Sequence, residues 1–305
     1  MNIKTIDIVI PIYNDNPHLL ATLSSIFVQT LPLGWALHVY VVDDGSESPI
    51  SIDDYDVDER CITLVRLENN KGVSIARNKG ASVGVGEAIL FLDADCSMVH
   101  DNVIAVLLGQ YIAGVDLCFG QIHAGGDFFW ARYQNEVALR RAESFNEGAA
   151  ASMTSQIFLV NRVNFHEVRG FDEKYHFGFE DRDLFITLIE NGASVALEEQ
   201  ALVNHNDELS LMSVTKKIFK SGKESSALFI QKHPEYYNNM SYVSADVRFS
   251  RGLLVLLVIF TRPILWPLVK VIDVAINGRL LPFYILKSLV KYTSGLAYLH
   301  GTYDA

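Results

Sequence analysis

The chain has 305 residues, of which 50% are hydrophobic, and its formal net charge of −11 is unevenly distributed. Residues 248–305 contain seven Lys and Arg against two acids, a charge of +5, which leaves −16 on residues 1–247. An acidic body argues against sequence-independent nucleic-acid binding, which needs a basic face, so no nucleic-acid partner is expected. The three cysteines have no CxxC spacing and cannot all pair, which is typical of a reducing compartment.

The first 98 residues alternate between strand-like and helix-like segments. Short apolar runs predict strands at 6–12, 36–46, 61–68 and 88–92, the second of which ends in an acidic turn. Helical spacing predicts helices over 18–29 and 71–85, and the Asn14–Pro17 turn predicts the start of the first. This alternation predicts an α/β fold with a doubly wound, mainly parallel sheet. No apolar stretch with a cleavage site precedes the first strand, so no signal peptide is expected.

The segment after residue 99 is less regular. The pattern predicts a strand at 115–126, a helix at 128–145, a strand with a short helix and turn at 155–175, a helix at 181–191 and two short strands within 193–206. We detect no internal repeat and no low-complexity tract. A single α/β domain with a helical appendage therefore accounts for the chain.

Two carboxylates, Asp93 and Asp95, follow the buried strand predicted at 88–92. An unpaired buried charge is costly, so this pair should lie in solvent or hold a ligand. Hard divalent cations prefer oxygen ligands, and a cation that also binds phosphate needs only one or two protein carboxylates. Because ligands of doubly wound sheets sit beyond the carboxyl ends of the strands, the turns after the first, second and fourth strands are expected at one edge.

The segment from residue 251 onward is apolar and basic. Nine apolar residues at 252–260 are interrupted by Arg262 and Pro263 before a second apolar run at 264–269. A membrane-spanning helix needs about 20 mostly apolar residues, so an interfacial or re-entrant segment fits better than a span. Core helices packed on the body are the alternative. We expect contact with a membrane surface through 251–291.

Six motifs occur in an order that resembles the family 2 glycosyltransferases with the GT-A fold: VIPIYN, VVDDGS, GVSIARNKGA, ILFLDAD, GFDEKY and GFEDRDL. The resemblance covers roughly residues 5–210. It implies inverting transfer of a sugar from a nucleoside-diphosphate donor, with Mn or Mg bound at the Asp-x-Asp motif. The expected layout is a GT-A domain at 1–247, comprising a nucleotide-binding half at 1–98, an acceptor half at 99–210 and a helical connection at 211–247. A helical tail follows at 248–305.

The resemblance also implies roles for acidic residues. Asp95 is the expected metal ligand, and His205 matches a histidine that completes the metal site in some members, although an ordinary loop histidine remains an alternative. Asp93 is expected to orient the donor. Inversion needs a base on the face opposite the leaving group, and Asp181 matches that base, with Glu180 as second choice. A solvated helix cap is the alternative for both, because carboxylates are stabilised at helix N-termini.

The nucleotide half of the donor is expected over the first two turns. By resemblance, Pro11, Tyr13 and Asp43 match base-binding positions, with Asp44 as a substitute. A carboxylate there can accept the N–H of uracil, which favours a UDP-sugar. Arg77 matches a basic position near the nucleotide, but it can also pair with Asp43 or Asp93, and the sequence leaves these alternatives open.

Two other functions are compatible with part of the pattern. The LDADCS run fits a haloacid-dehalogenase-like phosphatase, with Asp93 as nucleophile and Glu180 and Asp181 as distal metal ligands, but three predicted strands precede it. A non-catalytic sugar-nucleotide-binding protein is the other. Cys96 stands where many relatives have a further Asp, which puts the surroundings of the metal site in doubt.

We therefore expect an inverting, metal-dependent hexosyltransferase of cell-surface polysaccharide synthesis. Its acceptor is expected to be a saccharide or a lipid-linked saccharide, by analogy alone. From the apolar basic tail we expect the protein in the cytoplasm, peripheral to the inner face of the cell membrane.

Overall fold

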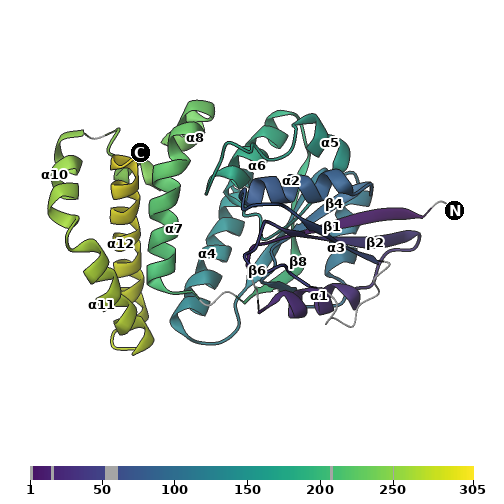
Figure 1. The fold of residues 1–305 in the computed structure, drawn as a ribbon, viewed down its shortest axis with the longest axis horizontal. Helices are drawn as coiled ribbons and strands as arrows, with labels where there is room; N and C mark the ends of the chain where they lie inside the picture. The colour runs from purple at the N-terminus through teal and green to yellow at the C-terminus, as the bar shows by residue number, and fades with distance from the viewer. Residues whose placement is uncertain (1–2, 15–16, 52–60, 207–208, 250) are drawn as a thin grey trace. The chain divides into compact units, whose positions relative to one another are not determined.

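The computed structural model describes residues 3–14, 17–51, 61–206, 209–249 and 251–305 (Figure 1). The chain forms two compact units. The first comprises Met1–Asp127, Gln134–Glu173 and Asp181–Asp207, and the second comprises Phe128–Tyr133, Lys174–Glu180 and Glu208–Ala305. The helices of residues 211–247 thus share a unit with those of residues 251–305.

The first unit contains an eight-stranded sheet with the order β3-β2-β1-β4-β7-β6-β8-β5. The strands are β1 (Lys4–Ile12), β2 (Trp35–Asp43), β3 (Ile62–Arg66), β4 (Ala88–Leu92), β5 (Cys96–Met98), β6 (Leu117–His123), β7 (Ile157–Asn161) and β8 (Val195–His205). The first four strands of this order are parallel, β7 is antiparallel to both neighbours, and β6 and β8 are parallel. Strand β5 is antiparallel to β8. The predicted α/β fold with a mainly parallel sheet is confirmed.

Helices cover both faces of this sheet. Along β1, Ile6, Ile8 and Ile10 join the core under one face, whereas Val9 joins the core under the other, because successive strand side chains point to opposite faces. Helices α1 (Leu19–Phe27) and α3 (Val103–Ile112) pack on the first face. On the other face lie α2 (Val73–Val83), α5 (Arg162–Glu167) and α6 (Glu180–Glu190), which Figure 1 draws above the strands.

One local detail differs from the sequence-based expectation. Residues 193–206 form the single strand β8 rather than two short strands, although its pairing with β6 shifts register between Phe119 and Gln121. Pro11 lies within β1, one residue before its end, and beyond the last residue of β1 that pairs with β4. The turn predicted to begin the first helix includes residues 15–16, which lie outside the described residues.

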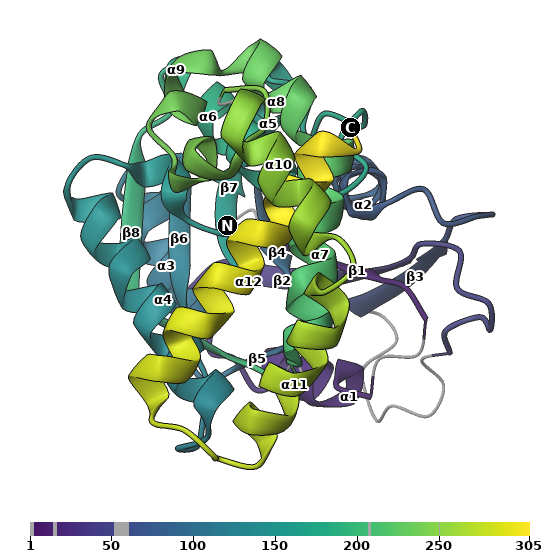
Figure 2. The ribbon, with the colours of Figure 1, turned by 90° about the vertical axis from the view of Figure 1, so that its left-hand side faces the viewer.

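The second unit is helical. Its helices include α7 (Leu211–Glu224), α8 (Ser226–Lys232), α9 (Pro234–Asn238), α10 (Arg251–Thr261), α11 (Leu265–Asn277) and α12 (Phe283–Tyr303), with a short turn of 3₁₀ helix at Ser241–Ala245. Figure 2 shows α10, α11 and α12 nearest the viewer, with α7 behind them. A Cβ at Gly222 would lie 2.9 Å from the carbonyl oxygen of Tyr298, and one at Gly301 would clash with that of Phe219. These two glycines therefore allow α7 and α12 to approach closely.

The described residues also include α4 (Phe129–Asn146) and a 3₁₀ turn at Ala150–Ser152. Among the described helices, none is by itself both long and apolar enough to cross a bilayer. Leu254–Thr261 and Leu265–Asn277 together reach the required length and hydropathy, but the pair is bent by 70° at the break between them.

Candidate active site

The carboxyl edge of the sheet gathers the acidic turns of the first unit. Strands β1, β2 and β4 are parallel, so the residues that follow them lie at the same edge. Strands β4 and β6 are both antiparallel to β7, and β8 is parallel to β6, so β8 runs in the same direction as β4. His205 therefore ends at this edge. Helix α6 connects to β8 through residues 191–194, so it runs back along the strand and begins, with Asp181, at that edge too.

The Asp93–Asp95 turn joins β4 to β5 and is fixed from both sides. The backbone N–H of Asp93 donates to the carbonyl of Gln156 at 3.0 Å. The hydroxyl of Thr22, a fully buried residue of α1, donates to the carbonyl of Ala94 at 2.8 Å. These bonds hold the turn against the sheet and α1, so the two carboxylates are presented in a defined orientation.

Asp93 forms an ion pair with Arg77 of α2. The Nη2 of Arg77 donates to Oδ1 of Asp93 at 2.7 Å, and the guanidinium lies 5.2 Å from the centroid of the Phe171 ring. Burial raises the pKa of Asp93 and the charge of Asp95 adds to this, although Arg77 opposes it. Arg77 is 3% exposed, and its Nε and Nη1 are buried without a hydrogen bond to the described residues. Of the two partners that the sequence left open for Arg77, Asp43 and Asp93, the structure pairs it with Asp93.

Asp95 and His205 face each other across the ends of β5 and β8. Cys96 and His205 are paired residues of these strands, and Nε2 of His205 lies 3.5 Å from Oδ2 of Asp95. Burial opposes ionisation of Asp95, but the hydrogen bond and charge of His205 outweigh it and lower the pKa of the carboxyl. The Sγ of Cys96 donates to Oδ1 of Asp95 at 3.6 Å.

The donor atoms at this point fit a divalent cation. One ligand atom each from Asp95, Cys96 and His205 lie within 4.8 Å of one another. Burial raises the pKa of the Cys96 thiol well above its ordinary value, so the carboxylate oxygen and imidazole nitrogen are the natural ligands. One carboxylate oxygen and one imidazole nitrogen are suitable ligands for Mn, and the carboxylate is also a suitable ligand for Mg.

The loops after β1 and β2 hold four predicted donor-binding residues. The carboxylate of Asp43 accepts a hydrogen bond from the N–H of Ser46 at 2.8 Å and forms an ion pair with Arg66. The carboxylate of Asp44 accepts hydrogen bonds from the N–H groups of Lys71 and Gly72 at 2.8 and 2.9 Å. Both carboxylates thus have protein partners that shape their loops.

The two other predicted donor-binding residues lie along and after β1. Pro11 pairs with Val42 of β2, and Tyr13 is 46% exposed just beyond the end of β1. Among Pro11, Tyr13, Asp43 and Asp44, the exposed ring of Tyr13 is the most accessible to a ligand.

Asp181 lies in the first turn of α6 and is half-buried. Its Oδ1 accepts the backbone N–H of Arg182 at 2.8 Å, as expected of an acid at a helix N-terminus. Glu180, the second choice for the base, belongs to the second unit. Before it, Gly178 and Phe179 have φ angles of 79° and 69°, and the ring of the buried Phe179 stacks on Phe229 at 4.7 Å.

Gln134 is a site residue that sequence reasoning missed. Its Oε1 lies 3.0 Å from Nδ1 of His205, although the two residues are 71 positions apart. A glutamine in an ordinary helical segment carries no local signal, so only the packing of α4 beside the end of β8 reveals this contact.

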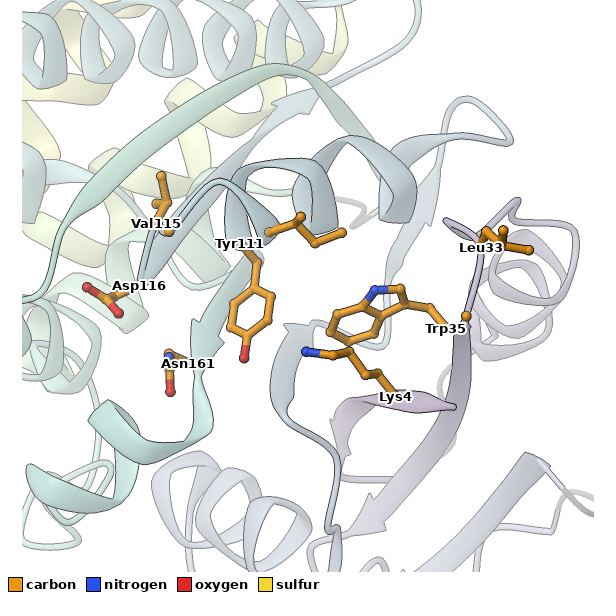
Figure 3. A pocket seen from close by; sticks show the side chains of 10 residues that line it. Lys4, Leu33, Trp35, Tyr111, Val115, Asp116 and Asn161 are labelled. Carbon is orange, nitrogen blue, oxygen red and sulfur yellow. The ribbon is translucent and has the colours of Figure 1, made fainter. Parts of the chain in front are cut away.

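A hollow lies at the opposite edge of the sheet. It has a volume of about 630 Å³ and includes residues at the start of β1 and β2 and at the end of α3. Figure 3 shows Lys4, Trp35 and Tyr111 around it; the Trp35 and Tyr111 rings meet edge to face at 5.7 Å. Because the acidic turns follow the other ends of these strands, this hollow is separate from the candidate active site.

Comparison with known proteins indicates the family to which this chain belongs. The sequence model of "Glycosyl transferase family 2" matches residues 7–171. The "Pre-mycofactocin glycosyltransferase" of Mycobacterium tuberculosis is 28% identical over 250 residues, which cover 76% of this chain and 49% of the relative. The "Glycosyltransferase GlyG" of Streptococcus pneumoniae is 28% identical over 193 residues, which cover 56% of this chain and 63% of the relative. The chain spans about half the length of the first of these relatives.

A solved structure supports the fold. The crystal structure of GalNAc-T7 with UDP, GalNAc and Mn²⁺ superposes with a TM-score of 0.52 at 18% identity, covering 68% of this chain and 44% of that one. This likeness supports the GT-A type of α/β fold that the strand order already indicates. Since the family model matches more than half of its residues, the chain belongs to glycosyl transferase family 2.

Proposed function

We propose that the chain transfers a sugar from a nucleoside-diphosphate donor to an acceptor hydroxyl, with inversion at the anomeric carbon. The observation that carries this proposal is the pairing of Asp95 with His205, 3.5 Å apart, at the carboxyl edge of a family 2 sheet. The solved GalNAc-T7 structure, which contains UDP and Mn²⁺, favours a UDP-sugar and a Mn- or Mg-type ion. The acceptor is a saccharide or a lipid-linked saccharide of cell-surface polysaccharide synthesis.

The residues divide the chemistry between them. Asp95 and His205 hold the cation, which when bound neutralises the charge that develops on the departing diphosphate. Asp93, anchored by Arg77, orients the sugar end of the donor. Pro11 and Tyr13 contact the base, together with Asp43 or Asp44. Inversion requires the acceptor to approach the face of the sugar opposite the departing diphosphate.

Asp181 acts as the general base on that opposite face, with Glu180 as the alternative. It takes the proton of the acceptor hydroxyl while the hydroxyl oxygen attacks the anomeric carbon. The bond from that carbon to the diphosphate oxygen breaks, and the diphosphate leaves with the electron pair. Asp181 lies in the first turn of α6, which begins at the carboxyl edge of the sheet.

Release of nucleoside diphosphate tests this function against its alternatives. The purified chain is incubated with a panel of UDP-sugars and Mn²⁺, and UDP release is measured with p-nitrophenyl phosphate as a parallel substrate. Transfer predicts UDP release only from a sugar donor and only with the metal. Phosphate release from p-nitrophenyl phosphate would favour a phosphatase. Mn²⁺-dependent UDP binding without turnover of any donor would favour a non-catalytic nucleotide-sugar-binding protein.

The second unit supports a membrane-facing role for residues 251–291. On α11, Val269, Ile272 and Ile276 are buried in the core, whereas Val271 and Val274 are 67% and 66% exposed. On the α11–α12 connection and the start of α12, the exposed apolar side chains are Leu280, Leu281, Tyr284 and Ile285. Several exposed apolar side chains in one segment favour an interaction surface there.

The charges of residues 262–305 favour an anionic lipid surface. The cations there are Arg262, Lys270, Arg279, Lys287 and Lys291. The two acids there have partners within the unit, since Asp273 accepts the N–H of Leu211 at 2.8 Å and Asp304 pairs with Arg262 at 3.1 Å. Exposed apolar groups with surrounding cations are typical of interfacial helices. We place the protein in the cytoplasm, peripheral to the inner face of the cell membrane.

A further inference from the structure

Gln134 and Asp95 contact opposite sides of the His205 ring. The Nδ1 atom of His205 lies 3.0 Å from Oε1 of Gln134, and Nε2 lies 3.5 Å from Oδ2 of Asp95. All three side chains belong to the first unit and are half-buried. The imidazole is therefore held between an amide oxygen and a carboxylate.

The amide oxygen decides which nitrogen carries the proton. An amide oxygen only accepts hydrogen bonds, so Nδ1 of His205 must be the protonated nitrogen in this contact. A neutral imidazole has one N–H, and its Nε2 then presents a lone pair toward Asp95. A lone pair facing a carboxylate oxygen is repulsive unless a cation lies between them, which is either a second proton on Nε2 or a metal ion. The pair is thus arranged to share a proton or a metal ion.

Gln134 is itself held in place by its neighbour. The side chain of Asn135 accepts the N–H of Ala124 at 2.8 Å and donates to the carbonyl of Ala124 at 2.9 Å. These two hydrogen bonds from one amide group fix α4 against the end of β6. Gln134 is the preceding residue of the same helix, so its backbone is positioned by this anchor.

We infer that Gln134 is a positioning residue, which keeps His205 in the Nδ1–H tautomer so that Nε2 can bind the divalent cation with Asp95. The inference rests on the proposed function, because it concerns the same metal site. Partners of this kind, which orient a ligating histidine, typically change metal affinity by 10- to 100-fold when they are removed.

Three glutamine variants of the full chain test this role. Gln134→Met removes the acceptor with little change of volume, and Gln134→Glu keeps an acceptor. Gln110→Met removes the hydrogen bond from another half-buried glutamine, which donates to Glu198 at 2.9 Å, and serves as the matched control. Mn²⁺ affinity is measured by electron paramagnetic resonance, and the His205 tautomer by long-range ¹H–¹⁵N NMR.

The expected result is a dissociation constant for Mn²⁺ that rises about 10- to 100-fold in Gln134→Met. The dissociation constants of Gln134→Glu and Gln110→Met for Mn²⁺ should remain close to that of the unsubstituted chain. The Nδ1–H tautomer should dominate in the unsubstituted chain and lose population only in Gln134→Met. Unchanged affinity and tautomer in Gln134→Met would overturn the inference.

The proposed metal site has a separate outcome. If the unsubstituted chain binds no Mn²⁺, the proposed metal site itself is wrong. If it binds Mn²⁺ and loses it in Asp95→Asn, while Gln134→Met binds normally, only the role of Gln134 is refuted.

Discussion

Arg77 and Asp93 form an ion pair of 2.7 Å, and this pair leaves Asp95 to a different partner, His205. The two carboxylates are separated by one residue, yet their environments push their pKa values apart. Burial raises the pKa of Asp93, whereas the contact with His205 outweighs burial and lowers the pKa of Asp95. Asp95 is therefore the carboxylate that stays ionised most readily, which suits a metal ligand.

Loss of the Arg77 side chain should destabilise the first unit. Arg77→Met leaves Asp93 without its cation, so we expect the free energy of unfolding to fall by about 3 kcal/mol. Lys4→Met is the control, because it breaks an exposed ion pair with Glu87 and should change the free energy of unfolding only slightly. Urea unfolding followed by circular dichroism measures both. Equal stability of the two variants would contradict a structural role for the Arg77–Asp93 pair.

Much of the fold was accessible from local patterns. The apolar run before Asp93 predicted β4, and the helical spacing after Gly72 predicted α2, because each pattern matches the period of its element. The antiparallel direction of β7 could not be predicted, because the residues of one strand do not indicate which strands pair with it. The single strand β8 was also missed, because Glu198 and Glu199 interrupt its apolar pattern where its pairing with β6 is irregular.

The candidate site was accessible only in part. Asp95 and His205 were proposed together from the resemblance, and the structure brings their side chains within 3.5 Å. The partners of Asp43 and the contact of Gln134 with His205 arise from tertiary packing between distant segments. A single sequence carries no signal for such contacts.

Asp181→Asn should separate donor binding from turnover. The amide keeps the size of the side chain but cannot accept the proton of the acceptor hydroxyl. We expect UDP affinity to stay within about twofold and the turnover number to fall by at least about 100-fold. Glu180→Gln is the companion variant, and it should retain most of the activity. The reverse order of these two effects would assign the base to Glu180.

Leu280→Glu should weaken membrane binding. Leu280 is 67% exposed at the turn between α11 and α12, so the substitution alters the surface and not the core. Flotation with vesicles that contain 30% phosphatidylglycerol should recover the unsubstituted chain and about tenfold less of the variant. Leu33→Glu, at a 96% exposed position of the first unit, is the control and should float normally. Flotation of both variants with the vesicles would refute the lipid surface.

Truncation of the tail is a poor substitute for this surface variant. Tyr298 on α12 is buried and its hydroxyl lies 2.7 Å from that of Tyr237, and Leu299 belongs to the core of the second unit. Removing residues 251–305 would expose this core, so a loss of membrane binding would be confounded by unfolding.

Asp246 should make stability depend on pH in acid. Burial opposes its ionisation, but hydrogen bonds from Arg248 and Tyr237 outweigh burial and hold its pKa below the ordinary value of 3.8. A depressed pKa in the folded state adds stability above the unfolded-state pKa, and this contribution is lost as the pH falls through the folded-state pKa.

The corresponding measurement compares Asp246→Asn with the unsubstituted chain. The variant should be less stable at pH 7 by about 2 kcal/mol, since it breaks a buried, charge-assisted network. The difference should shrink as the pH is lowered below about 4. Glu87→Gln, which removes an exposed charge, is the control and should show little pH dependence. A constant difference for Asp246→Asn from pH 7 to pH 3 would contradict the assigned shift.

The most direct test of the metal-assisted donor site is calorimetric titration of UDP into the chain with and without Mn²⁺. We predict that Mn²⁺ tightens UDP binding at least about tenfold in the unsubstituted chain, equivalent to about 1.4 kcal/mol, and has no effect in Asp95→Asn. Asp101→Asn, at an exposed acid, is the control and should behave like the unsubstituted chain. Mn²⁺-dependent UDP binding of equal strength in Asp95→Asn would contradict the account.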